Sequence, residues 1–373
     1  MSMPQQNTVL ILQGGGALGA YQAGVYQQLH EAAMPIEWVI GTSIGAINCA
    51  LIAGNPPETR VAQLRSFWDS LAPNAMHRNQ LWPSMTPWLN MTGGMNAMGT
   101  MNTLMNGVDG FFKPRVGAAW DINAKVPLNQ AGFYDTSPLK ATLEKYLNFD
   151  YLNNGNMRIS VCAVDLDNGQ GVTFDSHKEK ITVEHIMASG ALPPGFPPIE
   201  IAGRAYWDGG VYSNSPLEIF LQDKSKVDAL CFMVDLWDPT EARPKSIAEA
   251  MARYKNIQYA SRSQEQLLMY QKIQDMQGVI RSLSEQLSAE QRKKKEIQAL
   301  MKLGCEHTIN VVHLIMKALP DDHYFKDVDF SAATLQTRWD TGQHDCKRAL
   351  KHKAWLQPLP PHAGLVIHEL VQE

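Results

Sequence analysis

A serine between two glycines, in residues 41–45, constrains the fold of this chain more than any other feature. It follows a short apolar run, Trp38 to Ile40, and precedes apolar and small residues at helical spacing through Ala53. In so tight a strand–turn–helix, side chains at the glycine positions would clash, and the serine hydroxyl is exposed at a helix N-terminus. The pattern predicts an α/β fold with Ser43 as a nucleophile, and an ordinary glycine-rich turn is the alternative. The other residues of this nucleophile elbow are Gly41, Thr42, Ile44 and Gly45.

A glycine-rich loop, residues 14–19, joins an expected strand at 8–13 to an expected helix at 20–33. Its spacing matches G-x-G-x-x-G, but a dinucleotide site also needs an acidic residue after the second strand, where this chain has Gly41-Thr42-Ser43. Consecutive glycines can instead expose backbone N–H groups as an oxyanion hole. The candidate members of that hole are Gly14, Gly15, Gly16, Ala17, Leu18 and Gly19. The glycine loop and the elbow would then lie side by side at the carboxyl end of a parallel sheet.

The serine needs a base, and the best-placed candidate is Asp208, which precedes Gly209 and Gly210 in a tight turn. An aspartate in such a turn can simply accept a local hydrogen bond, or it can take the serine proton directly. A histidine of a Ser–His–Asp triad is the alternative, but no motif marks any of the eleven histidines. The residues therefore favour a Ser43–Asp208 dyad.

The remaining core follows the same alternation of strands and helices. We expect strands at 157–164, with 171–174 beside it, and at 228–236, which should close the sheet series. Helices are expected at 57–71, 135–147 and 182–189. The proline-rich stretch 191–198 is expected to be an ordered loop that forms a wall of the cleft.

Residues 73–120 break this pattern and are rich in methionine, glycine, asparagine and proline. Methionine suits surfaces that receive variable apolar ligands, so we interpret the segment as a flexible cap over an acyl-binding cleft. An irregular insertion with its own small core is the alternative. Its seven methionines are Met76, Met85, Met91, Met95, Met98, Met101 and Met105.

The composition changes after Glu241, and residues 241–373 are expected to be mostly helical, with a strand at 307–316 and a last helix at 331–350. Apolar residues within 269–287 repeat with heptad spacing, which favours packing on the chain's own helices and leaves a homodimer open. The basic run 292–295 is interpreted as a solvated helix face, with transient contact to a membrane surface as the alternative.

The composition of the chain limits its possible partners, cofactors and cellular location. A net charge of −4 without a basic patch argues against nucleic acid as a partner. The five cysteines are scattered without CxxC pairs, as in a reduced intracellular protein. There is neither an apparent signal peptide nor an apolar run long enough to cross a membrane, so we expect a soluble, cytoplasmic protein. No ligand cluster with metal spacing is present, and no metal or cofactor is expected.

Four separated blocks resemble the signature blocks of patatin-like phospholipases, in the family's order: 14–20, 41–45, 188–198 and 208–216. The resemblance covers residues 8–221 and implies Ser43 as nucleophile, Asp208 as base and the glycine loop as oxyanion hole. Leu18 stands where the family often has Arg or Lys, which implies loss of a cation that could contact a charged substrate. The stretch 326–331 and the helix with Trp339 and Gly342 resemble an uncharacterised domain appended to some bacterial members.

The sequence therefore predicts a three-layer α/β/α sandwich with a mostly parallel central sheet, a catalytic domain at 8–240 and a mostly helical C-terminal domain at 241–373. The predicted function is hydrolysis of carboxylic ester bonds in lipid-like substrates. An acyltransferase that uses the same site and a non-enzymatic lipid-binding or assembly protein are the alternatives. Phospholipid, acylglycerol, thioester and hydroxyacid oligomer all remain open as substrates.

Overall fold

The structure is a computed structural model of the 373-residue chain. It describes residues 7–72, 100, 103–118, 120–223, 228–240, 243–304, 307–319, 322–357 and 363–369, without the side chains of 261–263 and 354. The methionine-rich cap predicted at 73–120 lies mostly outside the described residues. Of its methionines, Met105 is described, and its side chain is exposed.

Nine of the described strands form one sheet in the order β11-β10-β9-β1-β2-β5-β8-β7, with β6 also paired to β5, and β3 Lys113–Pro114 and β4 Tyr134–Asp135 form a separate two-stranded sheet. The six strands from β11 to β5 are parallel, and β6, β7 and β8 are antiparallel to their neighbours. This confirms the mostly parallel sheet. The strands are β1 Asn7–Leu12, β2 Ile36–Thr42, β5 Arg158–Asp165, β6 Gly171–Asp175, β7 Ile199–Ile201, β8 Arg204–Asp208, β9 Ala229–Asp235, β10 Ile309–Ile315 and β11 Leu365–Glu369.

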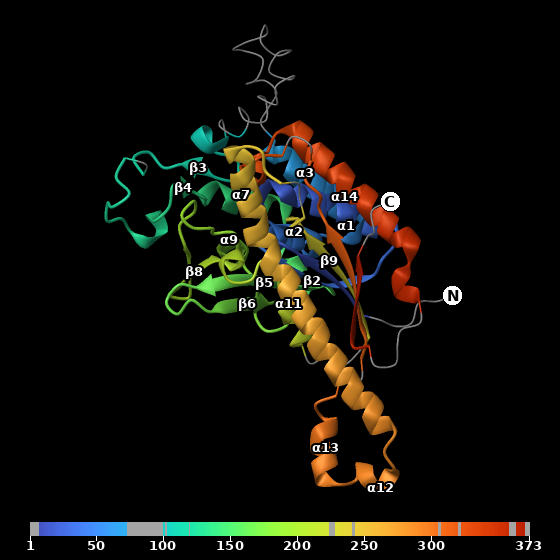
Figure 1. The fold of residues 1–373 in the computed structure, drawn as a ribbon. Helices are drawn as coiled ribbons and strands as arrows, with labels where there is room; N and C mark the ends of the chain where they lie inside the picture. The colour runs from blue at the N-terminus through green and yellow to red at the C-terminus, as the bar shows by residue number, and fades with distance from the viewer. Residues whose placement is uncertain are drawn as a thin grey trace.

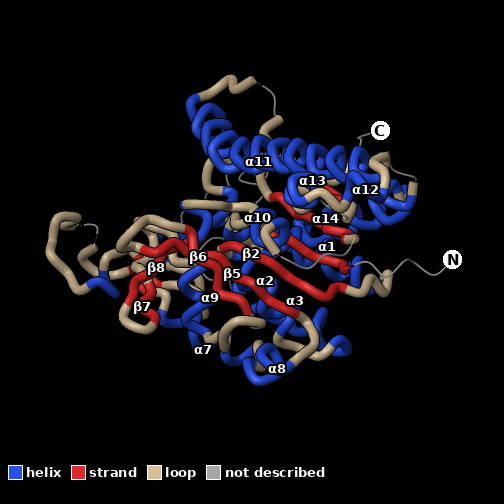
Figure 2. Tube along the Cα trace, turned by 90° about the horizontal axis from the view of Figure 1, so that it is seen from below, coloured by secondary structure: helices blue, strands red, loops and turns tan. Residues whose placement is uncertain are grey.

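Helices cover both faces of the sheet, because alternate residues of a buried strand point to opposite sides. In β1, Leu10 and Leu12 belong to the core with α1, α2, α3 and α14, whereas Val9 and Ile11 belong to the core with α10. Figure 2 shows α11 along one side of the strands and α7 and α8 on the opposite side. The three-layer prediction is therefore confirmed. The helices are α1 Gly19–Glu31, α2 Ile44–Ala53, α3 Pro57–Leu71, α7 Ser137–Tyr146, α8 Phe149–Asn154, α9 Val183–Ser189, α10 Leu217–Leu221, α11 Ile247–Glu285, α12 Ala289–Arg292, α13 Lys295–Met301 and α14 Ala332–His352.

Strand β9 does not close the sheet, contrary to the sequence-based expectation. Every residue of β9 is buried, and the strand pairs with β1 on one side and β10 on the other. A strand apolar on both faces is typical of the interior of a parallel sheet, so it needs neighbours on both edges. The chain after Glu241 supplies the second neighbour, β10, and β11 extends the sheet beyond it. The division into two domains near residue 240 stays a prediction.

Helix α14 from the C-terminal region packs directly on α1. A Cβ atom added to Gly24 would lie 1.9 Å from the Trp339 carbonyl oxygen, and one added to Gly342 would lie 2.1 Å from the Tyr21 carbonyl oxygen. The Trp339 indole donates a hydrogen bond to Gln27 Oε1 at 2.7 Å. Two glycines therefore let the backbones of these helices approach closely.

Helix α11 is 39 residues long and projects beyond the sheet, with α12 and α13 at its far end (Figure 1). The heptad positions Met269, Ile273, Met276 and Leu283 are each 41–67% exposed, whereas Gln274 on another face of the helix is buried. The expectation that this seam packs on the chain's own helices is therefore wrong for these four side chains. Among the described helices, α11 included, none combines the length and apolar character that crossing a membrane requires.

Candidate active site

Ser43 occupies a strained turn between the end of β2 and the start of α2. Its φ of 57° and ψ of −124° lie in a region that residues other than glycine rarely adopt. A Cβ at Gly41 would lie 2.5 Å from the backbone of Gly45, and a Cβ at Gly45 would lie 2.2 Å from the Leu12 carbonyl oxygen. Both elbow glycines are therefore required by close backbone contacts, as the motif predicts.

A second serine fixes the backbone of the elbow. The Ser43 amide donates a hydrogen bond to Ser189 Oγ at 3.0 Å, and Ser189 is fully buried at the end of α9. Sequence reasoning missed this residue. The signal was present, because Ser189 stands in the third of the four recognised blocks, which was interpreted only as a cleft wall.

Asp208 is the last residue of β8, is 1% exposed, and lies beside Ser43. Its Oδ1 accepts a hydrogen bond from the Gly210 amide at 2.7 Å. Burial raises the pKa of Asp208 to about 7, although hydrogen bonds from the Ser43 hydroxyl and the Gly210 amide act to lower it. The structure thus brings together the two side chains that the sequence nominated from positions 165 residues apart.

The turn after Asp208 is held between β5 and the glycine loop. A Cβ at Gly209 would lie 2.6 Å from the Cys162 carbonyl oxygen, so a larger residue would displace the turn. Asn214 then bridges to the loop: its Nδ2 donates to the Gly14 carbonyl at 3.1 Å, and its own carbonyl accepts from the Gly14 amide at 3.2 Å. Asn214 was not singled out from the sequence, although it stands in the fourth block.

The backbone amides of the six candidate oxyanion residues differ in whether they already donate a hydrogen bond within the protein. The amides of Gly14, Leu18 and Gly19 donate to carbonyl groups of the protein. Within the described part of the chain, the amides of Gly15, Gly16 and Ala17 have no hydrogen-bond acceptor. Three of the six predicted amides are therefore available as donors to a ligand at this loop. Of these three residues, Gly15 and Gly16 are half-buried, whereas Ala17 is fully buried.

The side chain of Leu18 lies in the hydrophobic core. It is 0% exposed and belongs to the same buried cluster as Ile44 and Trp68. Leu18 therefore packs the loop against the helices and does not face a ligand.

Two histidines near the core are engaged elsewhere. His185 Nδ1 accepts a hydrogen bond from the Thr182 amide at 2.9 Å and caps α9, and burial lowers its pKa. His313 Nε2 lies 2.9 Å from Asp235 Oδ2. In the described parts of the chain, no cluster of three or more His, Cys, Asp or Glu side chains is arranged to hold a metal ion.

The C-terminal region covers the back of the glycine loop through a 3₁₀ turn, η4, Lys326–Val328. Gly16 has φ +56°, and a Cβ there would lie 2.2 Å from the Asp327 carbonyl oxygen. On the other side, the Trp237 indole donates to the Gly14 carbonyl at 2.9 Å. The loop is thus held by segments that the signature blocks do not include.

Two family models match this chain. One, described as patatin-like phospholipase, matches residues 10–221, and another, described as patatin phospholipase, matches residues 257–362. Lysophospholipase nte1 of Aspergillus terreus is 57% identical over 44 residues, which are 12% of this chain and 3% of that protein. Patatin-like phospholipase domain-containing protein 6 of Mus musculus is 43% identical over 63 residues, 17% of this chain and 5% of that protein. The matches thus span a small part of these much longer relatives.

Solved structures are also similar to this chain. VipD from Legionella pneumophila has a TM-score of 0.39 and 15% identity, with 94% of this chain and 67% of that chain covered. Human GIVD cytosolic phospholipase A2 has a TM-score of 0.32 and 10% identity, with 61% of this chain and 42% of that chain covered. Since one family model alone spans more than half of the sequence, including the elbow, the glycine loop and the Asp208 turn, the chain belongs to the patatin-like phospholipase family.

Proposed function

We propose that this protein is a serine hydrolase that cleaves carboxylic ester bonds of lipid-like substrates with a Ser43–Asp208 dyad. The observation that carries the proposal is the hydrogen bond between the Ser43 hydroxyl and the buried Asp208 carboxylate, beside the glycine loop, where a Cβ on Gly14 would lie 3.0 Å from Ser43 Cβ. A nucleophile, a base and oxyanion donors at one place are the minimum set for acyl transfer. The names of the relatives, a lysophospholipase and phospholipases, support a lipid ester as substrate.

The reaction has two steps. Asp208 takes the Ser43 proton as the Ser43 oxygen attacks the acyl carbonyl, and the oxyanion is stabilised by the amides of Gly15 and Gly16 and the N-terminus of α2. Collapse of this intermediate breaks the ester bond, and the alcohol leaves with the proton from Asp208. Water, deprotonated by Asp208, then attacks the acyl-serine, and the acid is released as Ser43 regains its proton.

The raised pKa of Asp208 suits this role. An ordinary aspartate is a weak base near neutral pH, whereas a carboxylate whose pKa is about 7 accepts a proton more readily and returns it to the leaving alcohol. The Gly210 amide holds the carboxylate in one orientation. A fixed carboxylate can therefore act without a histidine between it and the serine.

The decisive experiment is Ser43→Ala, assayed with a chromogenic acyl ester and with a fluorophosphonate label. We expect activity to fall by a factor on the order of 10⁴ or more, and labelling to disappear, because no other group replaces the nucleophile. Ser288→Ala, at the start of α12, is the matched control and should keep both signals. Retained hydrolysis in Ser43→Ala would reject the proposal. Labelling of the wild type without hydrolysis, but with acyl transfer to an added alcohol, would favour the acyltransferase.

We also propose that two copies of the chain associate through the exposed heptad stripe of α11, Met269, Ile273, Met276 and Leu283. Heptad spacing is the signal for helix–helix pairing, and exposed apolar side chains on one stripe gain from mutual burial. Sedimentation velocity should give a dimer that Met276→Glu converts to a monomer. A monomeric wild type at micromolar concentration would reject this proposal.

A transient membrane contact is proposed for the far end of α11, where α12 and α13 carry the exposed basic run 292–295. Leu300 and Leu303 beside it are 56% and 58% exposed. Basic and apolar side chains together are typical of surfaces that contact anionic lipid. Cosedimentation with vesicles that contain phosphatidylserine, compared with phosphatidylcholine alone, tests this contact.

A reducing, cytoplasmic location remains part of the proposal. The four cysteines within the described residues, Cys49, Cys162, Cys231 and Cys346, are all buried and free. Cysteines of this kind are typical of proteins in reducing compartments.

A further inference from the structure

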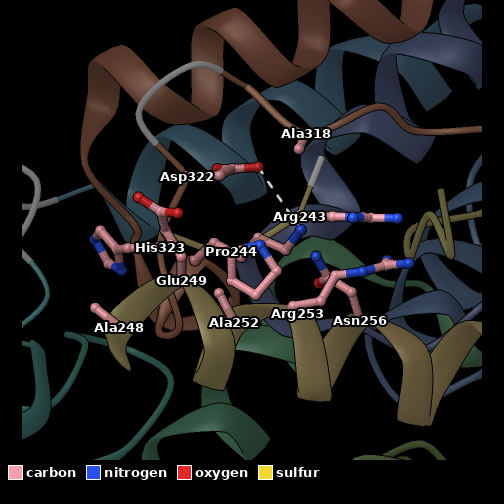
Figure 3. Close-up of a pocket in the computed structure, with 11 residues that line it drawn as sticks. Arg243, Pro244, Ala248, Glu249, Ala252, Arg253, Asn256, Ala318, Asp322 and His323 are labelled. Carbon is pink, nitrogen blue, oxygen red and sulfur yellow. Dashed lines mark ion pairs between the residues drawn. The ribbon is translucent and has the colours of Figure 1, made fainter. Parts of the chain in front are cut away.

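A cavity of about 290 Å³ lies between the start of α11 and the segment that leads into η4 (Figure 3). Neither Ser43 nor Asp208 lines it, so it is separate from the candidate active site. Its size is close to the lower end of the range for small-molecule pockets. The charged or titratable side chains that line it are Arg243, Arg253, Lys326, Glu249, Asp322 and His323.

Both carboxylates of the cavity already have partners. Asp322 lies 3.8 Å from Lys326 Nζ and 3.3 Å from Arg338 Nη2. Glu249 Oε2 accepts a hydrogen bond from the Lys245 amide at 2.6 Å, at the N-terminus of α11. The negative charges of the lining are therefore used within the protein.

The two arginines are not paired in this way. Arg253 Nη1 is buried and has no hydrogen-bond partner among the described residues, and no ion pair of Arg243 is present among them either. Figure 3 shows the two side chains extending in the same direction, whereas Glu249 and His323 lie toward the other end of the cavity. A buried cationic donor without an acceptor is costly, and two cations that line one cavity repel each other.

We propose that this cavity binds a phosphate-class anion, held by Arg243 and Arg253 with Lys326 beside them. A carboxylate is satisfied by one bidentate guanidinium, whereas a phosphate monoester carries up to two negative charges and three free oxygens. Two guanidinium groups match a phosphate better, because their planar forks can each bond two oxygens. The remaining volume leaves room for a small organic group on the phosphate.

The site lies behind the glycine loop. Lys326 belongs to η4, and the carbonyl group of the next residue, Asp327, lies against Gly16. The Nζ atom of Lys326 is 5.4 Å from the centre of the Trp237 ring. The Trp237 indole in turn bonds the Gly14 carbonyl. The anion would therefore bind on the opposite side of the loop from Ser43, outside the ester-binding cleft.

The test is calorimetric titration of the full chain with inorganic phosphate at constant ionic strength, comparing the wild type, R243Q/R253Q and the control K125Q/K272Q. The control removes the same charge from two exposed positions, one on the loop before α7 and one on α11. We expect the wild type and the control to bind with the same Kd and R243Q/R253Q to bind at least about tenfold more weakly, because each charge-assisted contact is lost. Equal affinity in all three proteins would overturn the proposal.

A second arm identifies the source of the phosphate and protects against a folding defect. Vesicles with phosphatidic acid, compared with phosphatidylcholine alone, distinguish a lipid headgroup from phosphate in solution. R253K keeps the charge and should still weaken binding, since an ammonium cannot form the bidentate contact. No binding of either phosphate source by the wild type would overturn the proposal. Since the readout is binding, failure here leaves the proposed ester hydrolysis untouched.

Discussion

The residues up to Leu221 and the residues after Pro244 meet at the glycine loop, but they are built in different ways. The first part positions Ser43 and Asp208 with short sequence motifs, in which a Cβ added to Gly41, Gly45 or Gly209 would lie within 3 Å of neighbouring backbone atoms. The second part has no motif of this kind at the loop. It contributes buried polar bonds, two strands and a helix that lies against α1. The chemistry thus depends on local geometry, and the position of the loop depends on long-range packing.

The largest expected effect belongs to the first part. Asp208→Asn removes the base while keeping the size and shape of the side chain, so hydrolysis should fall by a factor on the order of 10³–10⁴ with little change in folding. The measurement is kcat/KM on a chromogenic acyl ester, with circular dichroism for the fold. Asp121→Asn, on an exposed loop, is the control. An inactive His185 or His313 variant beside an active Asp208→Asn would show that a histidine is the base.

The next largest effect is expected in the second part, as a loss in the free energy of unfolding. Arg338 is 1% exposed, and its guanidinium donates to the carbonyls of Lys326 and Asp329 at 2.8 and 3.2 Å. Arg338→Met should lower the free energy of unfolding by about 3–5 kcal/mol, because it leaves the buried Asp322 carboxylate with Lys326, at 3.8 Å, as its remaining cationic partner beside the Leu319 amide. Urea denaturation measures this.

Arg348→Met is the control for that change. Arg348 lies 4.0 Å from Asp345, and its side chain is 32% exposed. An ion pair near the surface contributes about 0–1 kcal/mol, so the control should be nearly neutral. If both variants lose the same stability, the buried bonds to η4 are not what holds the second part in place.

A smaller effect is expected where α14 meets α1. Gly24→Ala forces a methyl group against the Trp339 carbonyl, which is backbone and cannot rotate away. The helices should separate slightly, at a cost of about 1–3 kcal/mol in thermal or urea unfolding. Gly190→Ala is the control, since the nearest atom to its added Cβ is 3.8 Å away. A stable Gly24→Ala protein would mean that the two helices tolerate separation.

The smallest expected effect is a pH dependence of the rate and of unfolding that differs between the two parts. Burial raises the pKa of Asp208 to about 7, and the base must be deprotonated, so kcat/KM should fall about tenfold for each pH unit below 7. The same shift favours the folded state at low pH, and that stability is lost as the pH rises from about 4 to 7. Asp208→Asn should remove this part of the pH dependence of unfolding. A flat rate profile between pH 5 and 7 would contradict the assignment of Asp208 as base.

His313 provides the contrast in the second part. Burial lowers its pKa, but the hydrogen bond to Asp235 and the negative charges of Asp235 and Glu369 outweigh burial and raise the pKa to about 9. The stability from this pair is present below pH 6.5 and is lost as the pH rises through about 9. Unfolding measured from pH 7 to 10 should therefore show a decline that Asp208→Asn leaves unchanged.

The amino-acid sequence by itself determined the elbow, the glycine loop and the Asp208 turn. Each consists of residues adjacent in the chain, and each depends on glycine where a Cβ would meet backbone. Strands such as β1 and β5 and helices such as α3 were also predictable, because their apolar periodicity is local. The residues also favoured the pairing of Ser43 with Asp208, and the family blocks implied the same pairing.

Only the tertiary structure decided which amides of the glycine loop lack acceptors, that Leu18 faces the core, and that β10 and β11 extend the sheet. It also placed Ser189 and Asn214 as the residues that fix Ser43 and Gly14. The contacts of Ser189 with Ser43, Asn214 with Gly14 and Asp327 with Gly16 join residues 146, 200 and 311 positions apart, and no local pattern records such contacts. The heptad stripe of α11 shows the same limit: its spacing is visible in the sequence, but its exposure depends on what the rest of the fold leaves uncovered.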